Sequence, residues 1–385
     1  MKPFIPFHLP DIGEEEIQSV VETLRSGWLT TGLKTQQFEN EFAEMVGTPH
    51  AVAVNSCTAA LHLALEAVGV TAGDEVIVPT MTFAATAEVV HYCRGVPVLV
   101  DCHHDTLNID VEAIEQAISP KTKAIIPVHF AGQPCEMDRI IDLARSRDIK
   151  VIEDAAHALP AKYHGEMVGT LSDITCFSFY VTKTMTTGEG GMATTENSEW
   201  AEYMKMLSLH GITRDAVNRY TPKGSWYYEI LYPGYKYNLT DIASALGIPQ
   251  LHKCHEFRET RQRYALLYNE GFKDVPEIIV PYVNKNIEHA WHLYVIQLDL
   301  PRLQIGRDEM IDLLKQHGIG TSVHFIPLHL HPYYARNPMY NQSRYPVANA
   351  VYKCMISLPI YTKMTQSDVF HVIEVLTTLI HKYRR

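Results

Sequence analysis

The sequence predicts an α/β fold, with a mostly parallel sheet flanked by helices and a smaller C-terminal α+β domain. The chain has 385 residues, which is long for one average domain and favours two. Between residues 51 and 195, short apolar segments alternate with helical patterns, as in parallel sheets covered on both faces. Beyond about Leu251 this regularity stops. We therefore expect a large domain at residues 1–250 and a small domain at residues 251–385.

The N-terminal segment carries two helical patterns. Apolar residues at positions 17, 20, 21 and 24 are spaced as on one face of an amphipathic helix, which Gly27 ends. Residues 28–32 are expected to form a loop, and Phe38 begins the apolar face of a second helix.

The alternating part predicts seven buried strands, because each apolar segment is short and bounded by turn or helix signals. Helical patterns lie between several of these strands, for example at residues 59–68 and 138–146. The predicted strands are residues 51–54, 75–78, 96–100, 124–128, 150–152, 174–180 and 191–195.

The C-terminal part mixes helices and strands without the regular alternation. Helices are predicted at residues 256–268, 307–317 and 366–381, and strands at residues 292–298 and 321–325. This arrangement is typical of a small α+β domain.

Composition excludes several classes of protein. The 46% apolar and 20% charged residues are those of an ordinary globular chain, and the net charge of −11 argues against a nucleic-acid or anionic-membrane surface. The seven cysteines are odd in number and none are spaced as CxxC, which favours free thiols in a reducing cytoplasm. We expect neither a signal peptide nor a membrane span, because no apolar run is long enough.

The twenty histidines do not predict a metal site. The His103-His104 pair and residues 329–331 are suggestive, but the chain has no HExxH motif and no paired Cys/His spacing. Ordinary surface histidines are the simpler interpretation.

The most informative segment runs from Phe177 to Gly191. An aromatic, apolar strand delivers Lys183 into a turn rich in threonine and glycine. A lysine at the end of a buried strand is unusual, because a lone buried ammonium group is costly. Formation of a Schiff base removes that cost, and lysines with readily shifted pKa values are suited to it. The alternative is a lysine whose charged end reaches solvent.

Asp154 and His157 follow the predicted strand at residues 150–152. In open α/β sheets ligands lie beyond the carboxyl ends of the strands, where an acid can pair with a buried cation such as a protonated pyridine. Taken alone, Asp154 is equally a loop acid or a helix cap, and His157 is equally a core or surface histidine. Asp154 and Lys183 together indicate the two halves of a pyridoxal phosphate site.

Residues 55–59 lie between a strand and a helix and contain Ser56, Cys57 and Thr58. Unpaired N–H groups at a helix start can bind a phosphate, and small side chains leave room for one. The simpler alternative is a Ser/Thr helix cap.

The order of these segments along the chain resembles the DegT/DnrJ/EryC1/StrS family of sugar aminotransferases, which have the aspartate aminotransferase fold (fold type I of the enzymes that depend on pyridoxal phosphate). The resemblance covers nearly the whole chain, from residues 26–32 to residues 321–325. Its most specific parts are residues 153–157 and residues 177–191. One departure is Val181, where many relatives carry proline. Lys183 disfavours the family's dehydratase branch, in which a histidine replaces the lysine.

The resemblance implies the cofactor contacts. Lys183 would form the Schiff base with pyridoxal phosphate and move protons, Asp154 would pair with the pyridine nitrogen, and His157 would neighbour the phenolic oxygen. The further contacts implied are stacking by Phe83, phosphate binding by Thr58, Ser178 and the Cys57 backbone, and a reach of Asn238 into the site of the neighbouring subunit. The protein would then be a homodimer with shared active sites.

The resemblance also implies the substrates. The amino group would pass from L-glutamate, leaving 2-oxoglutarate, to a nucleotide-linked keto sugar, at C4 of a UDP-4-keto-6-deoxy hexose. Trp28, Thr30, His324 and His329 would lie on the sugar side. The alternatives are amination of a dTDP-linked 3-keto sugar, an amino-acid aminotransferase, or a non-enzymatic regulator. An amino-acid aminotransferase usually binds a second carboxylate with an arginine, and residues 321–327 have none.

Overall fold

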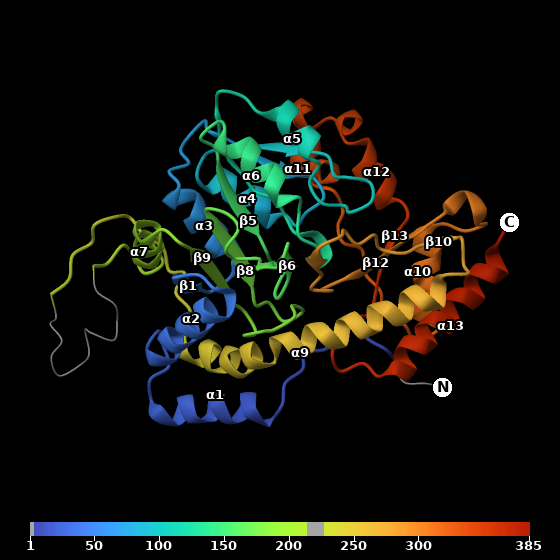
Figure 1. The fold of residues 1–385 in the computed structure, drawn as a ribbon, viewed down its shortest axis with the longest axis horizontal. Coiled ribbons are helices and arrows are strands. Elements are labelled where there is room, and N and C mark those ends of the chain that lie inside the picture. Colours follow the sequence, from blue (N-terminus) through green and yellow to red (C-terminus); the bar gives the residue numbers. More distant parts are fainter. Residues whose placement is uncertain (1–3, 214–226) are drawn as a thin grey trace.

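A seven-stranded sheet forms the centre of the large part of the molecule (Figure 1). The computed structural model describes residues 4–213 and 227–385. The strand order is β1-β9-β8-β5-β4-β2-β3. The strands are β1 (His50–Val54), β2 (Glu75–Pro79), β3 (Val96–Val100), β4 (Thr122–Ile125), β5 (Lys150–Asp154), β8 (Ile174–Ser178) and β9 (Gly191–Thr195). Each lies within one or a few residues of a predicted strand, so the predicted fold class is confirmed.

The sheet is parallel except for one strand. β3, β2, β4, β5 and β8 pair in parallel, whereas β9 runs antiparallel between β8 and β1. The carboxyl ends of the parallel strands therefore meet at one edge. Asp154 ends β5, and Ser178 ends the neighbouring β8.

Helices cover both faces of the sheet because both faces are apolar. Along β2, Val76 and Val78 pack into one hydrophobic cluster, while Ile77 between them packs into another on the opposite face. The first cluster includes residues of α3 (Cys57–Ala67), α4 (Ala85–Tyr92) and α7 (Ser198–Leu207). The second includes residues of α5 (Val111–Ala117) and α6 (Met137–Arg145).

The two predicted N-terminal helices are present as α1 (Glu14–Ser26) and α2 (Leu33–Val46), and Gly27 ends α1 in the left-handed conformation. Figure 1 shows α1 lying along α9 (Asp241–Phe272). The side of α1 that faces α9 is polar: Glu16 is fully buried and accepts hydrogen bonds from the side chains of Gln250 and Lys253. The apolar face predicted for this helix, with Ile17 and Leu24, points outward.

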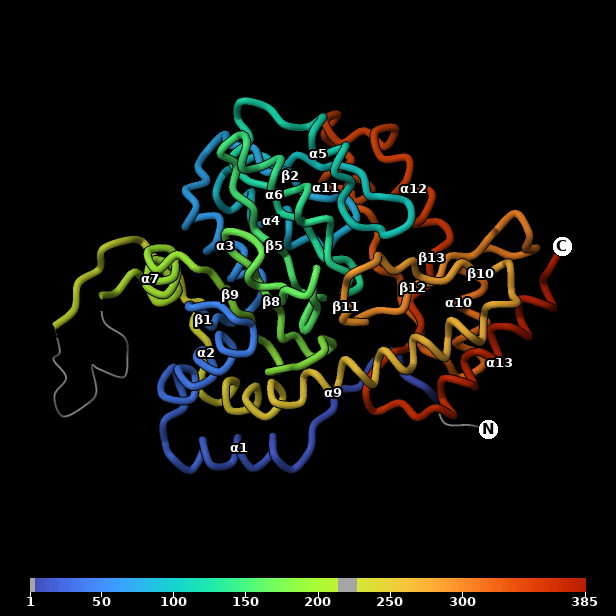
Figure 2. Tube along the Cα trace, in the orientation of Figure 1, coloured from blue at the N-terminus to red at the C-terminus, as the bar shows by residue number. Residues whose placement is uncertain are grey.

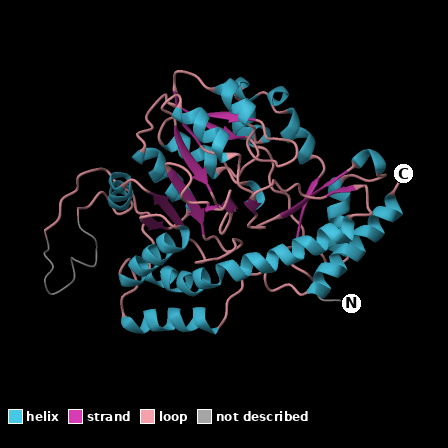
Figure 3. Cartoon of the chain, in the orientation of Figure 1, coloured by secondary structure: helices cyan, strands magenta, loops and turns pink. Residues whose placement is uncertain are grey.

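The C-terminal part surrounds a three-stranded sheet of order β10-β12-β13, as the secondary-structure view shows (Figure 3). Its elements are β10 (Ile278–Ile279), β12 (Tyr294–Leu298), β13 (Met355–Leu358), α10 (Arg307–Gln316) and α13 (Gln366–Tyr383). The predicted strand at residues 321–325 is wrong, because only Ser322 bridges to β13, at Ser357. β13 was not predicted.

The predicted domain boundary at residue 250 falls inside α9, a 32-residue helix that runs from the large sheet to the C-terminal part (Figure 2). The largest hydrophobic cluster also combines residues from both sides, including Leu63 from α3 and Leu328. The division into two domains therefore stays a prediction. No helix of the described chain is long and apolar enough to span a membrane.

Candidate active site

A cavity of about 460 Å³ opens at the carboxyl edge of the large sheet. The strand ends that predicted the site converge here, since β5 contributes Asp154 and the segment after β8 contributes Lys183. The predicted site residues that line the cavity are Cys57, Thr58, Phe83, Asp154, His157, Ser178, Lys183 and His324.

Asp154 lies on the floor of the cavity and is buried. Its Oδ2 accepts a hydrogen bond from the Thr86 hydroxyl at 2.9 Å, and its Oδ1 accepts one from the Ala156 N–H at 3.2 Å. Burial raises the pKa of Asp154, and these hydrogen bonds oppose the rise. A cationic ligand at this carboxylate would offset the cost of burying it.

Lys183 stands in the turn after β8, where its backbone N–H donates to Tyr180 at 2.8 Å. In the described chain its amine takes part in no hydrogen bond or ion pair within the usual distances. Burial lowers the pKa of Lys183 to about 8, against the opposing effects of Cys57 and Asp154. Much of the amine is therefore neutral near pH 8, and the neutral amine is the nucleophilic form.

The N-terminus of α3 forms another wall. The Ser56 hydroxyl caps the helix by accepting the N–H of Ala59 at 3.1 Å, so the predicted helix cap is present. The N–H groups of Cys57 and Thr58 have no acceptor in the described chain, which leaves them for a ligand. Gly191 keeps this wall close, because a Cβ there would lie 2.5 Å from the Ser56 carbonyl carbon.

Aromatic and histidine rings close the cavity on the side of the C-terminal part, and we call them the ring wall. His157 stacks on Phe325 with ring centroids 5.8 Å apart, and its ring lies 4.4 Å from that of His292. Burial, helped by Lys183, holds the pKa of His157 well below its ordinary value, so its ring is neutral. Among the residues that the structure describes, the buried Nδ1 atoms of His157 and His292 have no hydrogen-bond partner.

His324 belongs to the same wall, where Phe7 stacks on it and Ser357 hydrogen-bonds to its Nδ1 at 2.9 Å. Burial and the charge of Lys183 lower the pKa of His324 to about 4. The cavity residues His292 and Phe325 were not predicted. His292 begins one predicted strand and Phe325 ends another, but both strands were assigned to the C-terminal part, and nothing in the sequence connected either residue with the cavity.

Phe83 lines the cavity mouth but is 64% exposed. Its ring is tilted against Phe325, with centroids 6.2 Å apart. One face of this aromatic ring is therefore open to a ligand.

Three predicted site residues lie outside the cavity and close to one another. The Asn238 amide donates to the Thr31 hydroxyl at 2.6 Å, and the Thr30 carbonyl accepts the N–H of Asp241 at 3.2 Å. The Trp28 indole donates to the Thr31 carbonyl at 3.2 Å. Residues 28–33 and Asn238 thus form one cluster, which we call the outer cluster. None of the predicted residues Trp28, Thr30 and Asn238 lines the cavity of the same chain.

Asp241 holds the outer cluster together and was not predicted. Its buried carboxylate accepts the backbone N–H groups of Gly32, Lys34 and Thr35 and the Thr35 hydroxyl at 2.7–3.1 Å. The loop at residues 28–32 is therefore pinned to the start of α9.

His329 is also outside the cavity. It is fully buried, and its two ring nitrogens contact the Thr80 hydroxyl at 2.7 Å and the Asn349 amide oxygen at 3.0 Å. Tyr345 stacks on the ring. With both nitrogens engaged, His329 serves packing, and we leave it out of the substrate contacts proposed below.

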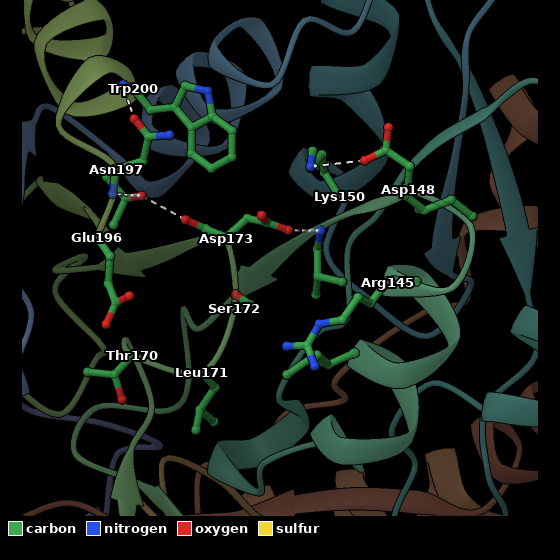
Figure 4. A pocket seen from close by; sticks show the side chains of 15 residues that line it. Arg145, Asp148, Lys150, Thr170, Leu171, Ser172, Asp173, Glu196, Asn197 and Trp200 are labelled. Carbon is green, nitrogen blue, oxygen red and sulfur yellow. Dashed lines mark hydrogen bonds and ion pairs between the residues drawn. The ribbon is translucent and has the colours of Figure 1, made fainter.

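A second cavity, of about 590 Å³, lies at the opposite edge of the sheet, near the start of β5 (Figure 4). Its polar groups are largely engaged with the protein: Lys150 pairs with Asp148 at 3.4 Å, and Asp173 accepts the Val151 N–H at 2.8 Å. It contains none of the predicted site residues, so the cavity at the carboxyl edge is the candidate active site.

The chain matches the DegT/DnrJ/EryC1/StrS aminotransferase family over residues 10–377. It belongs to this family. A curated relative from Bacillus subtilis, the spore coat polysaccharide biosynthesis protein SpsC, is 49% identical over 378 residues, which cover 98% of this chain and 97% of the relative. The uncharacterized protein MJ1066 of Methanocaldococcus jannaschii is 52% identical over 381 residues, 99% of both chains.

Solved structures agree with the fold. The proposed sugar aminotransferase Spr1654 of Streptococcus pneumoniae, known in PLP and PMP forms, is 38% identical with a TM-score of 0.92, covering 98% of this chain and 99% of that one. Helicobacter pylori PseC, an aminotransferase of pseudoaminic acid biosynthesis, is 29% identical with a TM-score of 0.92 and covers 99% of this chain and 100% of that one. The predicted family, the enzyme class and the cofactor, pyridoxal phosphate, are confirmed.

The cavity fits that cofactor on observations of this chain. The free N–H groups of Cys57 and Thr58 suit a phosphate, and the buried Asp154 carboxylate suits a protonated pyridine nitrogen. Lys183 offers an unpaired amine, and the exposed ring of Phe83 offers a stacking surface.

Proposed function

We propose that the enzyme transfers the amino group of L-glutamate to C4 of a UDP-linked 4-keto-6-deoxy hexose. The observation that carries this proposal is the lining of the cavity. Its described residues include several aromatic rings, such as Phe83, Tyr180 and Phe325, but no arginine. Aromatic rings suit a sugar, whereas an enzyme that acts on amino acids alone usually binds their second carboxylate with an arginine. The relatedness to SpsC and to PseC supports a sugar substrate.

The chain's own residues divide the chemistry among them. Bound pyridoxal phosphate supplies an electrophilic carbon and a ring that accepts electrons. In our proposal Asp154 holds a proton on the ring nitrogen, and the amine of Lys183 first tethers the cofactor and then moves protons at the substrate carbon. His157 would neighbour the phenolic oxygen, and Ser178 would join the α3 N-terminus in holding the phosphate. His324 faces the sugar.

We also propose that two chains share each site. The apolar residues Ile17, Leu24, Leu29 and Leu33 are all more than 40% exposed, and Leu33 reaches 69%. Such a face on and beside α1 is a candidate dimer surface. The outer cluster, with Trp28, Thr30 and Asn238, would then complete the partner's cavity, where Phe83 is open.

The nucleotide portion stays at the open rim in this proposal, because a charged diphosphate is costly to bury. Lys236 is exposed beside the outer cluster, where its amine donates to Asn238 Oδ1 at 2.5 Å. With the site shared between two chains, its charge would be offered to the diphosphate at the partner's rim. A cytoplasmic location belongs to the same proposal, and the seven free cysteines support it.

The experiment is a single-turnover assay. The cofactor is first converted to its aminated form with L-glutamate, and each acceptor is then tested for recovery of the pyridoxal absorbance. We expect recovery with the UDP-linked 4-keto sugar and with 2-oxoglutarate. Recovery only with a dTDP-linked 3-keto sugar would move the reaction to C3, the alternative position. Recovery with pyruvate or oxaloacetate, but with no nucleotide sugar, would make the protein an amino-acid aminotransferase.

A further inference from the structure

A second buried carboxylate stands directly behind Asp154. Glu153 is fully buried, and its Oε2 accepts the Nε2–H of the equally buried His129 at 2.7 Å. Its Oε1 accepts the hydroxyls of Ser172 at 2.7 Å and Thr175 at 2.8 Å. A carboxylate is an acceptor only, so all three donors are matched to it.

The protonation of His129 decides the net charge of this network. Burial disfavours a charged ring, whereas Cys135 and the Glu153 carboxylate act in the opposite direction and raise the pKa of His129. However, the backbone N–H of Cys135 donates to Nδ1 at 3.1 Å, and a doubly protonated ring has no lone pair there to accept it. The geometry therefore describes a neutral ring with its proton on Nε2, and the network carries one negative charge.

The network is joined to Asp154 through the backbone. Glu153 and Asp154 are neighbours at the end of β5, so their side chains point to opposite faces of the sheet. The His129 N–H donates to the Asp154 carbonyl at 3.2 Å, and the Asp154 N–H donates to the Pro127 carbonyl at 2.9 Å. The segment that carries His129 thus also holds the backbone of Asp154.

That segment supports the ring wall as well. The turn η1 (Phe130–Gly132) follows His129, and a Cβ at Gly132 would lie 2.8 Å from the His157 carbonyl oxygen. The Gly132 carbonyl accepts the N–H of Ala290 at 2.9 Å. The network therefore lies at the junction of Asp154 and His157, the two residues that would face the ring of a bound cofactor.

We propose that Glu153 is a positioning residue that fixes Asp154 and adds a second negative charge behind it, which stabilises protonated cofactor groups in the cavity. This inference rests on the proposed role of Asp154. Nothing in the sequence around residue 153 distinguishes Glu153 from an ordinary strand residue. The hydrogen bonds that its carboxylate accepts are what distinguish it.

The sign of the effect follows from simple electrostatics. A buried anion stabilises nearby cations, so loss of the Glu153 charge makes a proton held at Lys183 Nζ or at the ring nitrogen easier to remove. The titratable groups around Glu153 are His129 and Cys135 from the segment after β4 and Cys176 from β8, while Asp154 is its neighbour on the same strand with its side chain on the opposite face of the sheet. Only Asp154 among them is a second anion.

The test compares two variants of the holoenzyme that separate charge from shape. Glu153→Gln keeps the size and removes the charge, whereas Glu153→Asp keeps the charge and shortens the side chain. The readout is the pH midpoint of the visible absorbance of the bound cofactor, which follows loss of the proton at Lys183 Nζ. In Glu153→Gln we expect the midpoint to fall by about one pH unit and kcat by roughly tenfold, with KM for the sugar unchanged. In Glu153→Asp the midpoint should stay at the wild-type value.

A wild-type midpoint in Glu153→Gln, or an equal fall in Glu153→Asp, would overturn the inference. If Glu153→Gln does not fold, the variant with both Ser172→Ala and Thr175→Val replaces it. That variant leaves the charge in place and removes two donors, so its midpoint should stay at or above the wild-type value, and a fall would contradict us. Full activity of Asp154→Asn would instead contradict the proposed function. If Asp154→Asn is inactive but Glu153→Gln behaves as wild type, only this inference is wrong.

Discussion

The floor of the active site and the outer cluster are built in opposite ways. The floor, with Asp154 and Lys183, is complete within one chain, and its side chains converge on one cavity. The outer cluster, with Asn238 and residues 28–33, is equally well ordered by hydrogen bonds but lies outside that cavity. A surface loop held by hydrogen bonds, with the apolar Leu29 and Leu33 exposed, together with an exposed Phe83 ring, is the pattern expected of a site that a second chain completes.

The two regions also differ in what holds them. The floor depends on the topology of the sheet, which brings the carboxyl ends of β5 and β8 together. The outer cluster depends on one carboxylate, Asp241, which ties the residues before α2 to the start of α9. Changes at the floor should therefore abolish chemistry in the chain's own site, whereas changes at the outer cluster should lower stability or disable the site of the partner chain.

The largest effect is expected for Lys183→Ala. Loss of the amine removes both the tether and the proton-transfer group, so kcat should fall by at least about three orders of magnitude. Borohydride reduction of the wild-type holoenzyme should fix the cofactor to the peptide that contains Lys183. The control is Lys162→Ala, since Lys162 pairs with Glu288 far from the cavity lining. A label on another lysine would contradict the assignment of the floor.

Asp154→Asn should keep some cofactor but lower kcat by about two orders of magnitude, because a neutral amide no longer stabilises a protonated ring nitrogen. Steady-state kinetics with bound cofactor measured by absorbance would show this. The control is Asp148→Asn, which changes an exposed carboxylate outside the lining of this cavity and should behave as wild type. Near-wild-type rates in Asp154→Asn would show that another group holds the ring.

The apoenzyme should take up pyridoxal phosphate in a pH-dependent way. Burial lowers the pKa of Lys183 to about 8, so the neutral, nucleophilic amine rises from about a tenth at pH 7 to about nine tenths at pH 9. The rate of reconstitution, followed by visible absorbance, should rise roughly tenfold across this range. A rate that keeps rising steeply above pH 10 would indicate an ordinary exposed lysine.

The smallest effect on catalysis is expected for Asp241→Ala, which acts on stability. The buried carboxylate accepts four hydrogen bonds, and its loss leaves three backbone N–H groups without a partner. The free energy of unfolding should fall by about 2–3 kcal/mol in urea titrations. Asp274→Ala, at an exposed site, should change it by less than about 0.5 kcal/mol. Equal stability of the two variants would show that the outer cluster is not held by Asp241.

The floor was predictable because it lies at strand ends. Apolar strands and the polar residues that follow them are local in sequence, which is why Asp154, Lys183 and the Cys57-Thr58 pair were found. The ring wall was not predictable in the same way. Residues 321–325 alternate like a strand, but only Ser322 pairs with β13, and the chain then turns so that Phe325 stacks on His157.

His329 shows a second limit of sequence reasoning. The resemblance to the family implied a place for His329 on the sugar side, yet the ring is buried between Thr80 and Asn349. Contacts between residues so far apart in sequence leave no local pattern. The same holds for Asp241, whose partners lie more than 200 residues earlier in the chain.

Complementation between two inactive variants tests the central claim most directly, namely that the floor and the outer cluster of one site come from different chains. Lys183→Ala lacks the floor and Asn238→Ala lacks the outer cluster, but a mixed dimer of the two contains one intact site. After random reassortment half of the dimers are mixed, so about a quarter of wild-type activity should return. No recovery despite mass-spectrometric proof of mixed dimers, or full activity of a monomer at assay concentration, would contradict the account.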